Sequence, residues 1–238
     1  QQGIVMAASS YGSAFSILLS AEGALFALGE GEHGKLGTGN TQAADTPTLV
    51  QLPAGARACQ VACGKHHAAA VTTSGQLYVW GQAKALGLGR TEDAPQLLSI
   101  GEASLAAVGC GLEHTIAVTT EGHVWAWGNN QRGQLGLGHT TEAPVPTKVA
   151  LPEGTCVKAV AIGGEWSMLL TTEGQVMTCG KGELGALGLM LVEDSPLFQA
   201  IPNLGRACQV AAGLDHALAL LEDGQLFAWG CNDEGQLG

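Results

Sequence analysis

The chain has 238 residues, of which 46% are hydrophobic and 13% are charged. Its net charge of −11 comes from 21 acidic side chains against 10 lysines and arginines, so nucleic acid and anionic membranes are poor partners and a basic protein is a better one. No apolar run approaches the roughly 20 residues that a transmembrane helix needs. The N-terminus has neither an initiator methionine nor a signal-peptide pattern, so we expect a soluble piece of a longer protein.

One eight-residue pattern occurs five times: serine or an acid, a glycine, an apolar stretch and a closing glycine. It spans residues 22–29, 74–81, 121–128, 173–180 and 223–230. The closing glycines, Gly29, Gly81, Gly128, Gly180 and Gly230, are 52, 47, 52 and 50 residues apart. A period of about fifty residues indicates a repeat array, in which each unit buries its apolar face against its neighbours. We therefore expect one domain over residues 1–238, with repeats near 1–56, 57–103, 104–155, 156–205 and an incomplete 206–238.

Each repeat is expected to begin with a strand of small residues. These strands are predicted at residues 4–8, 59–63, 106–110, 158–162 and 208–212, and a second strand follows, for example at 67–72 and 216–221. The next dipeptide, Ser-Gly, Glu-Gly or Asp-Gly, suits a tight hairpin whose central residues need positive φ. The third strand is apolar on both faces, which favours a propeller blade packed between two neighbours over a two-layer sandwich.

The remaining part of each repeat is a glycine-rich loop and an outer segment. The loop carries Gly-Gln-Leu-Gly or a variant at 34–37, 133–136, 185–188 and 235–238, and in repeat two it is shortened. Pro47, Pro95, Pro144 and Pro196 open a fourth strand, which we place at the outer edge of the sheet because proline lacks an N–H. The fifth repeat stops at Gly238 before this strand.

This unit, with Val-Ala-x-Gly-x-x-His, then Gly-x-Leu-Tyr-x-Trp-Gly, then Gly-Gln-Leu-Gly, resembles the regulator of chromosome condensation repeat family over the whole chain. The resemblance implies an all-β propeller with antiparallel four-stranded blades, four repeats complete and a fifth partial. The family typically closes seven blades, so the chain resembles a fragment of a longer propeller. An open array exposes an apolar blade face, which we expect further blades or a second copy to cover.

The family's Gly-x-x-His position is met three times, by His67, His114 and His216. Repeat four has Trp166 in this place, and repeat one is expected to have Gly12. A histidine that recurs once per blade is expected to be held by local hydrogen bonds, so these residues and the five closing glycines are interpreted as structural.

The residues just before that histidine lie in the loop between the first two strands and should gather on one rim, where a rigid scaffold often carries its binding residues. The candidate partner-binding rim is Tyr11, Lys65, His66, Leu112, Glu113, Glu165, Trp166, Leu214 and Asp215. The resemblance implies that this rim engages proteins, including a small GTPase or, in a plant ultraviolet-B photoreceptor, a second copy. The alternative is a solvated acidic rim without a partner.

No cofactor or metal site is expected. The seven cysteines fall mostly at apolar repeat positions, which indicates reduced thiols in an intracellular protein of the cytoplasm or nucleus. Cys59 and Cys63 form a CxxxC, but no second pair or local histidine completes a zinc site. The glycine-rich loops do not end in Gly-Lys-Ser/Thr, as a phosphate-binding loop does.

Three functions fit these observations. The first is a non-enzymatic scaffold for protein–protein interaction, because we find no nucleophile–base–orienter set. The resemblance adds guanine-nucleotide exchange on a Ran-like GTPase, with Glu113, Glu165, Asp215, His114 and His216 as residues that could serve it. It also adds the substrate-recruiting propeller of a larger ubiquitin ligase or kinase.

Overall fold

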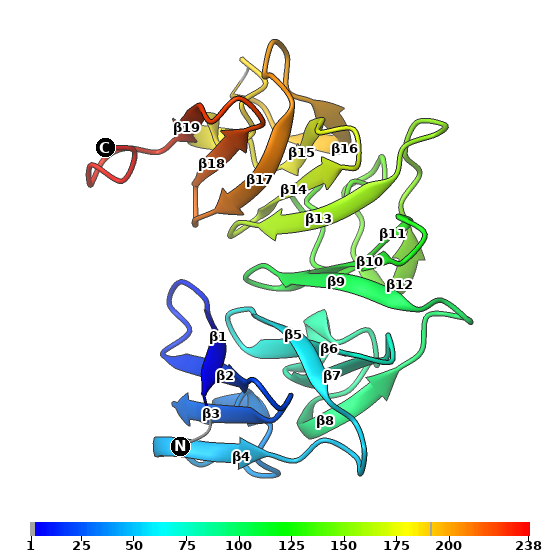
Figure 1. The fold of residues 1–238 in the computed structure, drawn as a ribbon, viewed down its shortest axis with the longest axis vertical. Coiled ribbons are helices and arrows are strands. Elements are labelled where there is room, and N and C mark those ends of the chain that lie inside the picture. The colour runs from blue at the N-terminus through cyan, green and yellow to red at the C-terminus, as the bar shows by residue number, and fades with distance from the viewer. Residues whose placement is uncertain (1–2, 191) are drawn as a thin grey trace.

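The computed structural model describes residues 3–190 and 192–238, and shows five antiparallel sheets that follow one another in an arc around a common axis (Figure 1). Blade 1 contains β1 (Ile4–Ser9), β2 (Phe15–Ser20), β3 (Leu25–Gly29) and β4 (Ala44–Val50). Blade 2 contains β5 (Ala58–Cys63), β6 (His67–Thr72), β7 (Leu77–Gly81) and β8 (Glu92–Leu98). Blade 3 contains β9 (Leu105–Cys110), β10 (His114–Thr119), β11 (Val124–Gly128) and β12 (Ala143–Lys148).

Blade 4 contains β13 (Val157–Ile162), β14 (Trp166–Thr171), β15 (Val176–Gly180) and β16 (Ser195–Ala200). Blade 5 has three strands, β17 (Ala207–Ala212), β18 (His216–Leu221) and β19 (Leu226–Gly230). Short 3-10 turns lie in three of the loops that follow a third strand: η1 (Glu32–Gly34), η2 (Ala83–Ala85) and η3 (Glu183–Gly185). The fold predicted from the repeat, with four complete blades and a partial fifth, is confirmed.

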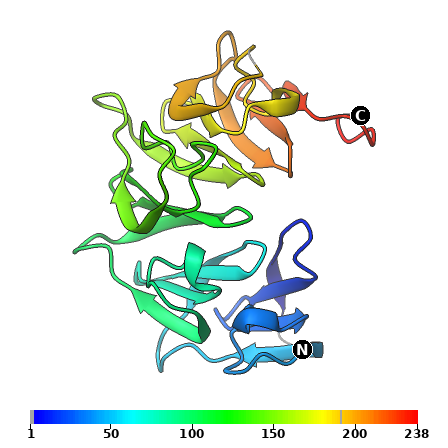
Figure 2. The ribbon, with the colours of Figure 1, turned by 180° about the vertical axis from the view of Figure 1, so that it is seen from behind.

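The strands of each blade are paired in chain order, and the first strands of neighbouring blades contact one another along the middle of the arc. Figure 2 shows the same progression from behind, with blades 1 and 5 at the two ends. The prolines lie inside the outermost strands, so these strands begin one to three residues before the predicted position. Each proline-bearing strand is the last strand of its sheet, where a missing N–H leaves the sheet intact. One of them, β16, is also bridged to the loop of the preceding blade, where Leu197 lies opposite Leu137.

The core is divided among the spaces between blades, because each hydrophobic cluster draws its residues from two consecutive sheets. In β7, Leu77 and Val79 belong to the cluster shared with blade 3, while Tyr78 and Trp80 belong to the cluster shared with blade 1. Both faces of this strand are therefore buried, as the sequence predicted. The last blade has one uncovered face: Leu226 is 65% exposed, although its equivalent in β7, Leu77, is fully buried.

Candidate functional site

Two sets of loops share one face of the propeller. The closing glycine of each third strand pairs with the first residue of the second strand, as Gly81 does with His67. The first-to-second loops and the third-to-fourth loops therefore leave the blades at the same end, and we call the surface they form the loop face. The hairpin turns and the links between blades form the opposite surface, the turn face.

The register places Phe15, not Gly12, at the histidine position of repeat one. Phe15 pairs with Gly29 as His67 pairs with Gly81. The prediction for Gly12 was wrong by three residues: β1 ends at Ser9, one residue later than predicted, and the first-to-second loop of blade 1 is two residues longer than that of blade 2. The longer loop carries Tyr11, whose side chain is 70% exposed on the loop face.

The buried histidines join neighbouring blades. His67 Nε2 is 2.9 Å from Thr115 Oγ1 of blade 3, and His114 Nε2 is 2.9 Å from Ser167 Oγ of blade 4. Trp166 takes the same place in blade 4, where its indole N–H donates to the Leu214 carbonyl of blade 5 at 2.8 Å. Trp166 was predicted as a residue of the rim, but its side chain is fully buried beneath it. His216, in the last blade, is only partly buried.

A backbone chain of hydrogen bonds links the first-to-second loops themselves. The Lys65 N–H donates to the Leu112 carbonyl at 3.1 Å, and the Leu112 N–H donates to the Gly164 carbonyl at 3.0 Å. The Gly164 N–H in turn donates to the Leu214 carbonyl at 2.9 Å. The inner rim is therefore fixed by main-chain bonds from blade 2 to blade 5, and its side chains are presented on a rigid support.

Acid should weaken the fold through the two buried histidines. Burial lowers the pKa of His67 to about 4 and that of His114 to about 3. Both are neutral in the folded chain at pH 5 to 7, whereas an unfolded histidine binds a proton below pH 6.5. Their contribution is complete above pH 6.5 and is lost as the pH falls toward 4 and 3. We expect roughly 2 kcal/mol of unfolding free energy to be lost between pH 7 and 5.5.

Urea unfolding at a series of pH values measures this slope. The double variant His67→Gln, His114→Gln should show a shallower dependence over the same interval. An equal slope in both proteins would assign the acid sensitivity to other groups.

Two of the rim acids are committed to ion pairs between blades. Glu113 lies 2.9 Å from Lys84 of blade 2 and accepts a hydrogen bond from Asn129 at 3.1 Å. Partial burial opposes ionisation of Glu113, but the bond and charge of Lys84 hold the Glu113 pKa below its ordinary value. The Glu113 bond is also the main cause of the raised pKa of Lys84.

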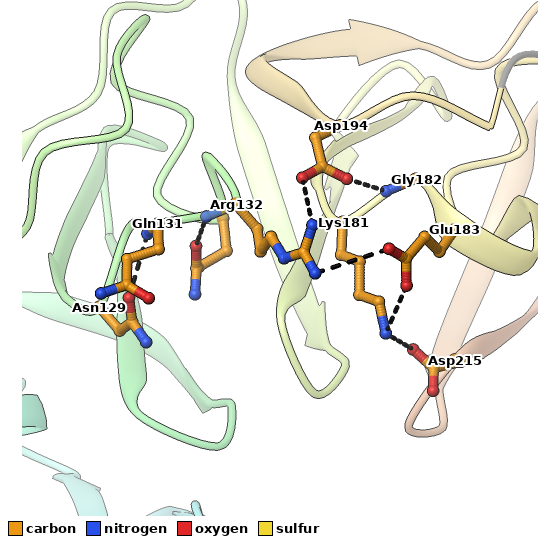
Figure 3. A network of polar contacts seen from close by, with 9 residues as sticks. Asn129, Gln131, Arg132, Lys181, Gly182, Glu183, Asp194 and Asp215 are labelled. Atoms are coloured by element: carbon orange, nitrogen blue, oxygen red, sulfur yellow. Dashed lines mark hydrogen bonds and ion pairs between the residues drawn. The ribbon is translucent and has the colours of Figure 1, made fainter.

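The second pair belongs to a larger network (Figure 3). Lys181 of blade 4 contacts Asp215 of blade 5 at 3.7 Å and Glu183 at 3.2 Å. Arg132 of blade 3 reaches Glu183 at 3.5 Å and Asp194 at 3.1 Å. This network joins three blades across the loop face. Glu165 is the rim acid that forms no ion pair with the described residues.

The structure brings together only some of the predicted rim residues. A cavity of about 460 Å³ is lined by Tyr11, Leu112, Leu214 and His216, and every blade contributes residues to its wall. His66 instead lies against blade 1, with its ring centroid 5.1 Å from that of His33. Lys65 is exposed, and the charged ends of Glu113, Glu165 and Asp215 face the third-to-fourth loops.

Charge is unevenly divided between the two faces, a feature that the sequence reasoning missed. Each charged residue can be assigned to a face by the loop in which it lies or by the nearer end of its strand. On this assignment the loop face holds 14 acidic and 6 basic side chains, a net charge of −8 out of the −11 for the chain. The turn face holds the other 7 acids and 4 bases. Assigning acids in the third-to-fourth loops, such as Glu30, Glu32 and Glu193, to their strand ends would have revealed this asymmetry.

The described residues contain no group of three or more His, Cys, Asp or Glu side chains placed to hold a metal ion. All seven cysteines are free thiols. In the part of the chain that the structure describes, no helix is long and apolar enough to cross a membrane.

Comparison with known proteins places the chain among its relatives. The RCC1-like domain family matches residues 1–238. The chain belongs to this family. The chain is 34% identical to a segment of the human E3 ubiquitin-protein ligase HERC2, a match that covers 95% of this chain and 5% of HERC2. It is 35% identical to the Arabidopsis thaliana ultraviolet-B receptor UVR8, over 90% of this chain and 50% of UVR8. The chain thus spans half or less of the length of these relatives.

Solved structures agree with this assignment. The human WBSCR16 structure superposes with a TM-score of 0.84 at 26% identity, covering 92% of this chain and 58% of that protein. Yeast RCC1 (Prp20), solved bound to Kap60, superposes with a TM-score of 0.61 at 19% identity, covering 96% of this chain and 70% of Prp20. The second likeness concerns the fold alone.

Proposed function

We propose that this RCC1-like propeller is a non-enzymatic interaction module that holds a basic protein partner on its loop face. The observation that carries the proposal is the net charge of −8 on the loop face. A surface of one sign steers partners of the other sign toward it and disfavours like-charged ones. The first-to-second loops of blades 2 to 5 are tied by main-chain hydrogen bonds, so little ordering cost is expected for these loops on binding.

The test must spare the ion pairs between blades. Reversing Glu113 or Asp215 would disturb contacts to Lys84 or Lys181 as well as the surface charge. Glu32, Glu165 and Glu193 form no ion pair with the described residues and lie on the loop face. The triple variant Glu32→Lys, Glu165→Lys, Glu193→Lys therefore changes charge with the least expected change in fold.

We expect this triple variant to lose at least tenfold in affinity for a basic partner captured from cells by the wild-type chain, with a steeper loss at low salt. The matched control is Glu22→Lys, Glu153→Lys, Glu173→Lys, which makes the same change in net charge on the turn face. Equal loss in the two triples would attribute binding to overall charge and contradict a loop-face site.

The ligase-type alternative is favoured by one finding, the 34% identity to a segment of HERC2. On this alternative the propeller recruits a substrate for a catalytic domain elsewhere in a longer protein, and the loop face is again the recruiting surface. Guanine-nucleotide exchange on a Ran-like GTPase is supported only by the fold likeness to Prp20, a protein studied for its binding to Gsp1p and histones.

A further inference from the structure

A group of basic side chains lies on the otherwise acidic loop face, at the junction of blades 1 and 2. The ring centroid of His33, in η1 of blade 1, is 5.1 Å from that of His66, in the first-to-second loop of blade 2. Lys65 precedes His66, and Lys35 directly follows η1. We call these four residues the basic corner. Blades 1 and 2 both have all four strands, so this junction does not border the uncovered face of the last blade.

The groups of the basic corner act on one another electrostatically. Burial lowers the pKa of His66, and the charges of His33, Lys35 and Lys65 lower it further. Glu113 of blade 3 acts in the opposite direction, but its carboxylate is held in an ion pair with a lysine of blade 2. The net field at His66 is therefore positive, which favours a bound anion and disfavours a metal cation.

Two groups of the basic corner lack a partner. Nδ1 of His66 is buried without a hydrogen-bond partner among the described residues, although the ring itself is partly exposed. An unpaired buried polar atom costs free energy, which a ligand that pairs with this ring would recover. Lys65 is exposed and forms no ion pair with the described residues. The other basic side chains of the loop face each contact a carboxylate: Lys35, Lys84, Arg90, Arg132 and Lys181.

Other blades place a carboxylate where blade 2 has His66. The residue before the second strand is Glu113 in blade 3 and Asp215 in blade 5. Each of these acids contacts a lysine from the third-to-fourth loop of the preceding blade. In blade 2, His66 meets the imidazole of His33 from that loop instead. The junction of blades 1 and 2 thus lacks a negative charge that its counterparts supply from within the chain.

We infer that the basic corner binds the phosphate of a phosphorylated serine or threonine in the basic segment of the partner protein. A phosphate monoester carries a charge of about −1.5 to −2 at pH 7 and three acceptor oxygens, which suits one ammonium group and two imidazoles. Lysines and arginines of the same segment lie along the acidic surface around it, which by itself repels an isolated anion. This inference rests on the proposed function and names a modification that the same face recognises.

The test uses three fluorescein-labelled peptides of lysine, glycine and alanine that differ in one central residue: serine, phosphoserine or glutamate. On an acidic face without a phosphate site, the added negative charge would weaken binding. We instead expect anisotropy titration of the wild-type chain to give the phosphoserine peptide a Kd at least fivefold lower than that of the serine peptide. A gain of the same size with glutamate would overturn the phosphate assignment.

The variant Lys65→Gln should reduce the phosphoserine gain to less than twofold. It should bind the serine peptide up to twofold more tightly than the wild type does, because it removes a positive charge from a face that holds a basic peptide. A loss of structure would instead weaken binding of both peptides. His66→Gln should reduce the gain in the same way.

Lys158→Gln is the matched control, because Lys158 is also exposed without an ion pair among the described residues but lies at the turn-face end of β13. It should keep the full phosphoserine gain. A gain that Lys65→Gln keeps, or a wild type that binds the serine and phosphoserine peptides equally, would overturn the phosphate site and leave the proposed function standing. Failure of the wild type to bind any of the lysine peptides would overturn the proposed function itself.

Discussion

Trp127→Ala is expected to lower the free energy of unfolding by about 4 to 5 kcal/mol. Trp127 is fully buried in the cluster between blades 2 and 3, and its indole N–H donates to the Ala85 carbonyl at 2.9 Å. Removing the side chain leaves a cavity at a blade interface and takes one of two donors from Ala85, the other being the Thr115 hydroxyl at 2.9 Å. Urea or thermal unfolding measures the loss.

Trp127→Phe separates the two causes of this loss. It keeps most of the apolar volume and removes the hydrogen bond, so we expect about 1 to 2 kcal/mol. If the free energy of unfolding of Trp127→Ala lies within 1 kcal/mol of the wild-type value, the view that stability is concentrated between the blades is contradicted.

Gly128→Ala should cost about 4 kcal/mol, because it combines backbone strain with a collision. Gly128 has φ of 103°, which an L side chain rarely adopts. A Cβ atom there would lie 2.5 Å from the Glu113 carbonyl oxygen and 2.8 Å from His114 Cα. These are backbone atoms of the first residue of β10 and of the residue before it, so they cannot move aside without disturbing the pairing of β10 with β11.

The control for this prediction is Gly154→Ala. Gly154 also has positive φ, 78°, but its added Cβ would have open space around it. We expect a loss of about 1 kcal/mol from strain alone, measured by the same unfolding experiment. Similar losses for the two variants would show that the close approach of the second strand is unimportant.

A feature could be predicted from the sequence when residues close together in the chain determine it. The five closing glycines indicated the repeat. Their φ values of 100° to 110° are ones that a residue with a side chain rarely adopts, which is why glycine recurs there. The error at Gly12 arose because counting back from a motif assumes equal loop lengths. Only the pairing of Phe15 with Gly29 revealed the two extra residues.

The exposure and ion pairing of the candidate rim residues were harder to predict from the sequence than the fold. Trp166 and Glu165 are neighbours in the chain, yet Trp166 is buried against blade 5 while Glu165 keeps part of its surface. Glu113 and Asp215 looked like free carboxylates, but Lys84 and Lys181 lie beside them from the preceding blade. Their pairing partners are 29 and 34 residues away in the chain, beyond the reach of a local pattern.

By itself the sequence determined the repeat, the strands, the glycines at strand ends and the outer proline strands, because each depends on backbone preference and hydrophobic period within one unit. The tertiary structure decided which acids form ion pairs between blades and which face holds the net charge of −8. These depend on distances between blades, which are set only when the units stack.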